Sequence, residues 1–366
     1  MPADLSFGRF FYPGPTEVRP DILRAMVRPM IPHRGVEAQA LNRRIMNGLR
    51  HVFRTRRPVY VMTASATGMM EAAVRNAQEG PALALVNGAF SARFARIAQV
   101  CDRRTRVLEV PWGETHPLEL VEEVLGTEQF GLMTVVHSET STGVLSDIRA
   151  LSAAAHRHGT MCVVDAVSSV GGVRVETDDW RLDCVLTGSQ KALAMPPGLS
   201  FAVASEPYIL QASSTPHRGF YLDLVEFERF ALEAQTPQTP ALPLLYAADA
   251  QLEHILAEGI EARWARHAAM LACVERWVDE RRAAGIDISI LARAGERAPT
   301  VSVLRVPPGT SVPALLEGVA NRGFVIAAGY GRLAATTVRI GHMGDHTPEG
   351  LGACLSALGE ALSAAA

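Results

Sequence analysis

The residue type that stands out for chemistry in this sequence is lysine, because it occurs once. Of the 35 basic residues, 34 are arginines and only Lys191 is a lysine. Arginine can replace lysine as a solvated charge, but its guanidinium group stays protonated and cannot attack a carbonyl carbon. The retained amine is therefore a candidate nucleophile, of the kind that forms an imine with a carbonyl compound. Chance retention is the alternative, so the surrounding residues must decide.

Polar residues follow the apolar runs on either side of Lys191. Lys191 lies in TGSQKALAMPPG, directly after an apolar run, and Asp165 ends the preceding run, TMCVVD. In a parallel sheet both positions would lie at the carboxyl edge, where open α/β sheets bind their ligands. A helix or turn cap is the alternative interpretation of Asp165. Another polar loop, HSETSTGVLSD, follows the run 132–137 and offers the hydroxyls of Thr140 and Ser141.

A third loop has the features of a phosphate site. The segment ASATGMMEA predicts a turn of small residues that opens directly into a helix, and Ser65, Ala66 and Thr67 there offer main-chain N–H groups and two hydroxyls. The start of a helix favours a bound phosphate, although an ordinary helix cap is the alternative. A phosphate site, an amine and a carboxylate together match the phosphate, the aldehyde and the ring nitrogen of pyridoxal 5'-phosphate. We therefore predict this cofactor.

Short apolar runs alternate with longer segments of helical periodicity over much of the chain. Strands that are apolar throughout and separated by amphipathic helices indicate a mostly parallel sheet covered on both faces. We therefore predict a large α/β domain over residues 16–250. Its strands are expected at 58–63, 82–86, 106–110, 132–137, 160–165, 184–188 and 199–204, and its helices at 68–79, 90–101, 117–126 and 147–158.

The C-terminal part of the sequence predicts a second, smaller α/β domain, 251–366. A Pro-rich stretch, 235–245, gives way to a long helical stretch that runs to about residue 284 and would bridge the two domains. A strand at 300–306, a helix near 311–322, the runs FVIAAG and TTVRIG, and a last helix from about residue 347 follow. Residues 1–15 are expected to form an N-terminal segment near the active site.

These motifs give the chain a resemblance to a known family. It resembles the class V aminotransferases of fold type I, specifically the alanine–glyoxylate and serine–glyoxylate aminotransferase group, from YPGPTEV (12–18) to VRIGHMGD (338–345). GSQKAL with the proline-rich turn after it is the most specific motif, and VDAVSSVGG, HSETSTGV and RIGHMG support it. The sequence departs from the family pattern in the phosphate loop, ASAT, where many relatives have glycines. A phenylalanine also stands where relatives have a stacking tryptophan.

The resemblance implies a role for each matching residue. Lys191 would form the internal aldimine with pyridoxal 5'-phosphate, Asp165 would hold the pyridine nitrogen, and Arg339 would bind the substrate carboxylate. Phe90 and Val167 would pack on the two faces of the cofactor ring. Other residues implied to bind the cofactor are Ser65, Ala66, Thr67 and Gln190 at the phosphate, Thr140 near the ring oxygen, and Thr239, which would reach a phosphate in the neighbouring subunit of a homodimer.

The activity that the resemblance implies is transamination by a ping-pong mechanism. A small amino acid, alanine or serine, would give its amino group to the cofactor, and a small 2-oxo acid such as glyoxylate or pyruvate would accept it. Transamination of an aminophosphonate or of ureidoglycine remains an alternative. A cysteine desulfurase is less favoured, because such enzymes have a histidine where Gln190 stands and a reactive cysteine on a mobile loop, whereas Cys354 lies in a helical stretch. A non-catalytic binding module is disfavoured by the intact set of Lys191, Asp165 and Arg339.

Composition disfavours several other classes of protein. The 35 basic and 38 acidic residues leave a formal net charge of -3, so no basic field is available for nucleic acid. The apolar runs are too short to span a membrane, and the N-terminus does not read as a signal peptide. Five scattered cysteines are typical of reduced thiols, which predicts a cytoplasmic protein.

Two further motifs imitate binding sites. GYGRLA (329–334) matches the GxGxxA dinucleotide pattern, but a strand-like run follows it where the pattern requires a helix. His342 and His346 are four residues apart, yet the sequence around them is loop-like and lacks the glutamate of an HExxH zinc site. We therefore predict neither nicotinamide binding nor a metal site.

Overall fold

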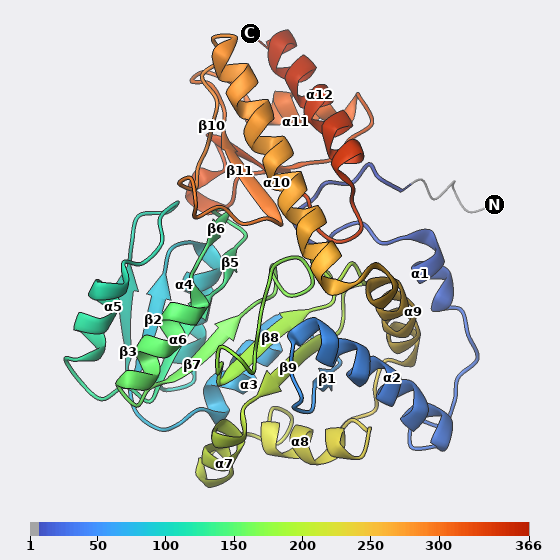
Figure 1. Ribbon diagram of the computed structural model, residues 1–366, viewed down its shortest axis with the longest axis vertical. Coiled ribbons are helices and arrows are strands. Elements are labelled where there is room, and N and C mark those ends of the chain that lie inside the picture. Colours follow the sequence, from blue (N-terminus) through green and yellow to red (C-terminus); the bar gives the residue numbers. More distant parts are fainter. Residues whose placement is uncertain (1–6, 366) are drawn as a thin grey trace.

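The computed structural model describes residues 7–365, whose strands form two large sheets and a small ribbon (Figure 1). The first sheet has seven strands in the order β1-β9-β8-β7-β4-β2-β3. All of them run in the same direction except β9, which is antiparallel to both of its neighbours. The strands are β1 Tyr60–Met62, β2 Ala82–Val86, β3 Thr105–Glu109, β4 Leu132–Val136, β7 Met161–Asp165, β8 Cys184–Gly188 and β9 Ser200–Ala204.

The inner strands of this sheet are apolar because helices pack against it. All five residues of β2, β4, β8 and β9 are buried, as a sheet between helical layers requires. β3 differs: it is the edge strand, and Arg106, Val107 and Glu109 are exposed on it. The helices of this part are α1 Pro20–Ala25, α2 Val36–Phe53, α3 Ala66–Asn76, α4 Ala89–Val100, α5 Leu118–Leu125, α6 Ile148–Arg157, α7 Glu206–Ser214 and α8 Leu224–Leu232.

The second sheet is antiparallel and lies in the C-terminal part of the chain. Its strands follow the order β10-β11-β13-β12, with β10 Ser289–Ile290, β11 Val301–Arg305, β12 Ala327–Ala328 and β13 Thr337–Gly341. Helices α11 (Val312–Ala320) and α12 (Pro348–Ala365) pack together beside it and share its hydrophobic core. The predicted α/β fold with a mostly parallel central sheet and a smaller C-terminal unit is confirmed.

Two helices, rather than the predicted single long one, connect the two sheets. α9 (Leu242–Glu258) packs on α1 and α2, whereas α10 (Ile260–Ala283) packs on α12. Gly259 separates them with a φ of 82°, a conformation that only glycine adopts without strain. The predicted boundary at residue 250 lies inside α9, so we propose Gly259 as the boundary between the large and the small domain.

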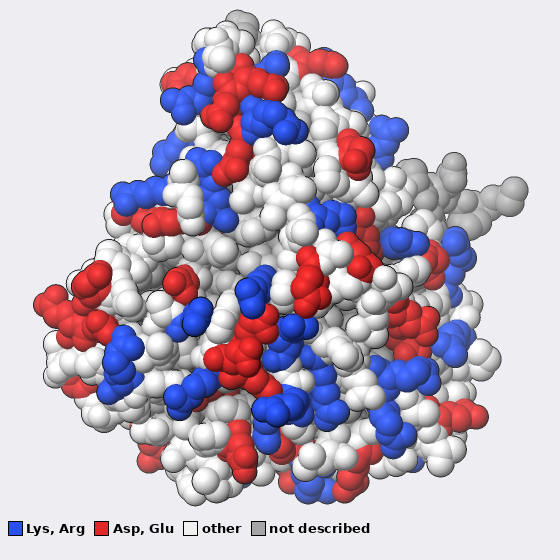
Figure 2. Space-filling model, viewed as in Figure 1, with Lys and Arg blue, Asp and Glu red and all other residues white. Residues whose placement is uncertain are grey.

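The surface carries charges of both signs. In the view of Figure 2, basic and acidic side chains are interspersed over both the large and the small domain. Among residues 7–365, no helix combines the length and the apolar character needed to cross a membrane.

Candidate active site

The carboxyl ends of the parallel strands lead into one cavity of about 200 Å³. The loops after β1, β2, β4, β7 and β8 all contribute side chains to it, as the open α/β architecture predicts. Every residue that the sequence analysis assigned to the cofactor lines this cavity except Thr239. Its wall consists of Ser65, Ala66, Thr67, Met70, Phe90, Arg93, Val136, Ser138, Thr140, Asp165, Val167, Ser168, Gln190 and Lys191.

The Lys191 amine lies in the wall of this cavity. Its side chain is buried, and Nζ donates hydrogen bonds to the main-chain oxygen of Pro13 at 2.5 Å and to Thr140 Oγ1 at 3.2 Å. Burial, together with the nearby Arg339 cation, lowers the pKa of Lys191 to about 7. A substantial fraction of this amine is therefore neutral at physiological pH, which is the form that attacks a carbonyl carbon.

Asp165 is the last residue of β7 and points into the same cavity. It is buried, and Oδ1 accepts a hydrogen bond from the main-chain N–H of Val167 at 2.9 Å. Oδ2 has no hydrogen-bond partner in the part of the chain that the structure describes. Burial raises the pKa of Asp165 to about 6, although the charges of Lys191 and Arg93 act in the opposite direction. A cationic N–H group bonded to Oδ2 would stabilise the carboxylate further.

The start of α3 borders the same cavity and has the features of an anion site. Ser65 is the N-cap residue, its hydroxyl makes no capping hydrogen bond, and the first turn carries no acidic residue. N–H groups in a first turn have no partner inside the helix, and the helix dipole adds partial positive charge there. Gln190 lies nearby over Gly188, where a Cβ atom would come 2.6 Å from Gln190 Oε1.

Glu139, which the sequence did not mark as a site residue, holds the first turn of α4, which carries Phe90. Its side chain is fully buried, and its carboxylate accepts hydrogen bonds from the main-chain N–H groups of Phe90 at 3.1 Å and Ser91 at 2.8 Å. It also accepts from the main-chain N–H and the hydroxyl of Ser141. A carboxylate at the first turn of α4 is favoured by the helix dipole. The only sequence signal was an acidic residue within the polar loop HSETSTG.

Arg339 extends from the centre of β13 in the small domain. It is buried, and Nε donates to the main-chain oxygen of Ala328 at 2.9 Å. Its terminal nitrogens have no acceptor among residues 7–365. Its guanidinium carbon lies 5.3 Å from the ring centroid of Tyr330. A guanidinium fork anchored by Nε and open at its terminal nitrogens is suited to bidentate binding of a carboxylate.

Comparison with known proteins identifies the family. A profile of the family described as Aminotransferase class-V matches residues 22–304. The chain belongs to the class V aminotransferases. It is 35% identical to an uncharacterized aminotransferase of Methanocaldococcus jannaschii, covering 91% of this chain and 86% of that one. It is 32% identical to the L-aspartate–glyoxylate aminotransferase of Paracoccus denitrificans, covering 92% and 86%. The crystal structure of the alanine–glyoxylate aminotransferase of Nostoc sp. superposes with a TM-score of 0.90 at 28% identity, covering 99% and 97%.

Class V aminotransferases depend on pyridoxal 5'-phosphate, and the cavity of this aminotransferase fits that group. The open N-terminus of α3 suits the phosphate and the amine of Lys191 suits the aldehyde. Oδ2 of Asp165, which accepts no hydrogen bond from residues 7–365, suits a protonated ring nitrogen. Phe90 and Val167 line the same cavity and offer apolar surface to the cofactor ring.

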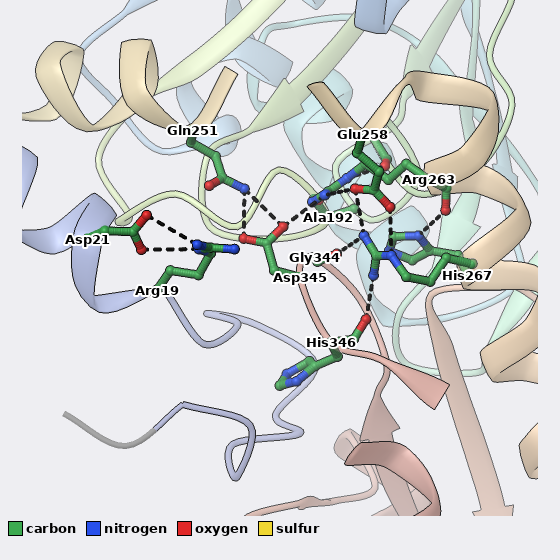
Figure 3. A network of polar contacts seen from close by, with 12 residues as sticks. Arg19, Asp21, Ala192, Gln251, Glu258, Arg263, His267, Gly344, Asp345 and His346 are labelled. Atoms are coloured by element: carbon green, nitrogen blue, oxygen red, sulfur yellow. Dashed lines mark hydrogen bonds and ion pairs between the residues drawn. The ribbon is translucent and has the colours of Figure 1, made fainter. Parts of the chain in front are cut away.

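A buried polar network joins the Lys191 loop of the aminotransferase to its small domain (Figure 3). Arg263, on α10, is only 1% exposed and donates to the main-chain oxygens of Gly171 and Ala192, both at 3.0 Å. The same guanidinium pairs with Asp345 at 2.8 Å and with Glu258 at 2.9 Å. Because Ala192 follows Lys191 and Asp345 follows the strand of Arg339, this one side chain fixes the two halves of the site relative to each other.

The remaining sequence predictions fall outside the cavity. Thr239 is exposed in the segment before α9. His342 bonds to Ser302 Oγ and His346 to the main-chain oxygen of Phe10. Residues 331–333 of GYGRLA form a single 3-10 turn, and the strand β13 comes next. Of the predicted N-terminal segment, residues 7–15 are described and contribute Pro13 to Lys191, whereas residues 1–6 lie outside the described residues.

Proposed function

We propose that this aminotransferase transfers the amino group of a small L-amino acid, such as alanine or serine, to a small 2-oxo acid such as glyoxylate or pyruvate. The observation that carries the proposal is that Lys191, Asp165 and the start of α3 border one cavity, while Arg339 lies close enough to Lys191 for its charge to lower the pKa of the amine. The names of the Paracoccus and Nostoc relatives support glyoxylate as the acceptor, because both contain it.

Each side chain has a separable task in the proposed reaction. Pyridoxal 5'-phosphate, when bound, supplies the aldehyde that receives the amino group and the ring that withdraws electrons from the substrate Cα. Arg339 binds the α-carboxylate and so orients Cα toward Lys191. Lys191 takes the Cα proton as a general base, which its pKa of about 7 permits. Asp165 keeps the ring nitrogen protonated, and Phe90 and Val167 exclude water from the ring faces.

A spectroscopic half-reaction tests the proposed function. The holoenzyme is mixed with L-alanine, and we expect the absorbance of the lysine-bound cofactor to convert to that of pyridoxamine phosphate, with pyruvate released in equal amount. Adding glyoxylate should reverse the absorbance change. Lys191→Ala should neither convert nor retain the cofactor after borohydride treatment. An amino-donor panel that produces no pyridoxamine phosphate would contradict the proposal.

A homodimer with shared active sites is the proposed assembly. Thr239 is exposed and lies away from the cavity of its own chain, which supports a role toward the site of a second copy. Sedimentation should give a dimer, and mixing a Lys191→Ala chain with a Thr239→Ala chain should restore one intact site per mixed dimer. A stable, fully active monomer would contradict this assembly. Five free cysteines support a reducing compartment, and we propose the cytoplasm.

A further inference from the structure

A second guanidinium group borders the active-site cavity. Arg93 lies one turn after Phe90 on α4 and lines the same cavity as Lys191. Its guanidinium carbon lies 4.9 Å from the ring centroid of Phe90, and Nη2 donates to the hydroxyl of Tyr330 at 3.4 Å. Within residues 7–365, no carboxylate forms an ion pair with Arg93. This exposed cation therefore borders the cavity without a direct ion pair to its own chain, although its charge lowers the pKa of Asp165.

Tyr330 connects this cation to the proposed carboxylate-binding arginine. Its ring packs against Phe90, with 5.3 Å between the centroids, and the Arg339 guanidinium carbon lies 5.3 Å from the same tyrosine ring. Arg339 thus meets the ring of Tyr330, whereas Arg93 meets its hydroxyl. Lys191 Nζ lies 5.5 Å from the Phe90 centroid. Arg93, Arg339 and the Lys191 amine therefore all lie beside the Phe90–Tyr330 pair.

The charge of Arg93 acts on the reacting groups. Burial is the main cause of the lowered pKa of Lys191, and Arg93 contributes to the lowering. Once Arg339 binds the α-carboxylate of a substrate, Arg93 is the cation that remains unpaired at the cavity. An unpaired charge beside a partly enclosed site is favourable for a ligand that brings the opposite charge.

We propose that Arg93 and the Tyr330 hydroxyl form a subsite for a second anionic group on the substrate side chain. The substrate class that fits is an amino acid with an acidic side chain, such as L-aspartate, which this subsite admits as an amino donor in addition to alanine and serine. The proposal rests on the proposed function, because it places the α-carboxylate on Arg339. Arg93 supplies the charge-assisted contact, and the Tyr330 hydroxyl holds its guanidinium and donates a second hydrogen bond.

A purely structural role for Arg93 makes a different prediction. If its guanidinium only supports the Phe90 ring, its removal will disturb the cavity for every donor to the same extent. A subsite for the substrate side chain instead produces a selective loss, confined to donors that carry the second anion. The ratio of kcat/KM for L-aspartate to kcat/KM for L-alanine separates the two roles.

The experiment measures this ratio with the holoenzyme and glyoxylate as acceptor. We expect the native enzyme to use both donors, and Arg93→Gln to lower the ratio about 10- to 100-fold, as loss of a charge-assisted hydrogen bond implies. Tyr330→Phe should lower it by a smaller factor, and Arg93→Lys should restore part of it, because the charge remains without the planar fork. Arg96→Gln is the matched control: Arg96 is exposed one turn further along α4, and the ratio should not change.

Binding of unreactive acids provides a second readout. Succinate carries two carboxylates and propionate one, so succinate should bind the native holoenzyme more tightly by calorimetry, and Arg93→Gln should abolish the difference. An unchanged donor ratio in Arg93→Gln, or equal affinity for the two acids, would overturn the subsite. Failure of the proposed function looks different: then no donor, acidic or neutral, forms pyridoxamine phosphate.

Discussion

The Nζ atom of Lys191 donates a hydrogen bond to the main-chain oxygen of Pro13, although 178 residues separate the two positions. The next residue, Gly14, has a φ of 126°, and a Cβ atom there would lie 2.4 Å from Cε of Lys191. The N-terminal segment therefore forms the wall against which the amine is positioned. Only glycine satisfies both the backbone conformation and the close approach.

Replacing Gly14 should consequently disable the enzyme without touching any polar group. In Gly14→Ala the new methyl group collides with the Lys191 side chain and displaces its amine. A displacement of about 1 Å at a reacting atom lowers a reaction rate by about tenfold or more. We therefore expect the amount of cofactor trapped by borohydride in a fixed time to fall by more than about tenfold. Gly352→Ala is the control, since a Cβ atom there meets nothing within 4 Å. Trapping at the native level in Gly14→Ala would refute the close contact.

The pH dependence of cofactor capture should report the pKa of Lys191. The neutral amine is the reactive form, and its pKa is lowered from 10.5 to about 7. The rate at which the apoenzyme captures pyridoxal 5'-phosphate should therefore rise with pH through a midpoint near 7 and level off above it. Arg339→Leu removes a cation that lowers this pKa, so the midpoint should move upward, whereas Arg96→Gln should leave it in place. A midpoint that stays near 10 in the native protein would contradict the assignment.

Asp165 should stabilise the apoenzyme less than a neutral residue would. Its pKa is raised by burial from 3.8 to about 6, so the folded state holds the proton more tightly than the unfolded state. The stability contributed by the protonated group is present below about pH 4 and is lost as the pH rises through 6. Asp165→Asn should therefore raise the free energy of unfolding of the apoenzyme at pH 7 by up to about 3 kcal/mol.

The same variant should lose activity. An amide cannot balance a protonated ring nitrogen, and we expect kcat to fall by about 100- to 1,000-fold, the usual effect of removing one electrostatic contact at a reacting centre. Denaturant unfolding of the apoenzyme and turnover of the holoenzyme measure the two effects separately. A variant that is both less stable and fully active would contradict this account of Asp165.

Glu139 should be required to hold the first turn of α4, which carries Phe90, in place. Its buried carboxylate accepts hydrogen bonds from Phe90, Ser91 and Ser141, and Glu139→Gln turns one acceptor oxygen into a donor that faces other donors. We expect the free energy of unfolding to fall by about 2–4 kcal/mol. Glu123→Gln, at an exposed position of α5, should change stability little. Equal denaturation midpoints for the two variants would show that the buried carboxylate is not needed.

Arg263 should be indispensable for the alignment of the two domains. Arg263→Met leaves Asp345 without a charge partner in a buried network, a change that costs about 3–5 kcal/mol when an ion pair is broken on one side. Denaturant unfolding measures this loss. The control is Arg282→Met near the end of the same helix, where the side chain is exposed. A stability loss below 1 kcal/mol in Arg263→Met would mean that the network contributes no more than a surface pair.

The sequence was sufficient to predict the alternation of strands and helices along the chain and the cofactor chemistry. Apolar runs separated by amphipathic segments predicted the parallel sheet, because such strands must be covered on both faces. Asp165 and Lys191 were recognisable because each follows an apolar run, and strand ends of a parallel sheet meet at one edge. The strand predicted at 106–110 is β3 (Thr105–Glu109), but its position at the sheet edge could not be predicted, because the order of strands within the sheet depends on how the crossover connections pack.

Tertiary structure alone decided which distant residues touch these groups. Pro13 and Glu139 lie in motifs of the resemblance, but nothing in those motifs or around Arg93 predicted which residues they contact. Their roles arise because a hydrogen bond or an ion pair depends on distances of a few ångströms between segments that are far apart in the chain. The division of the helical stretch at Gly259 had the same origin: α9 and α10 pack on different domains, and the chain must turn where their surroundings change.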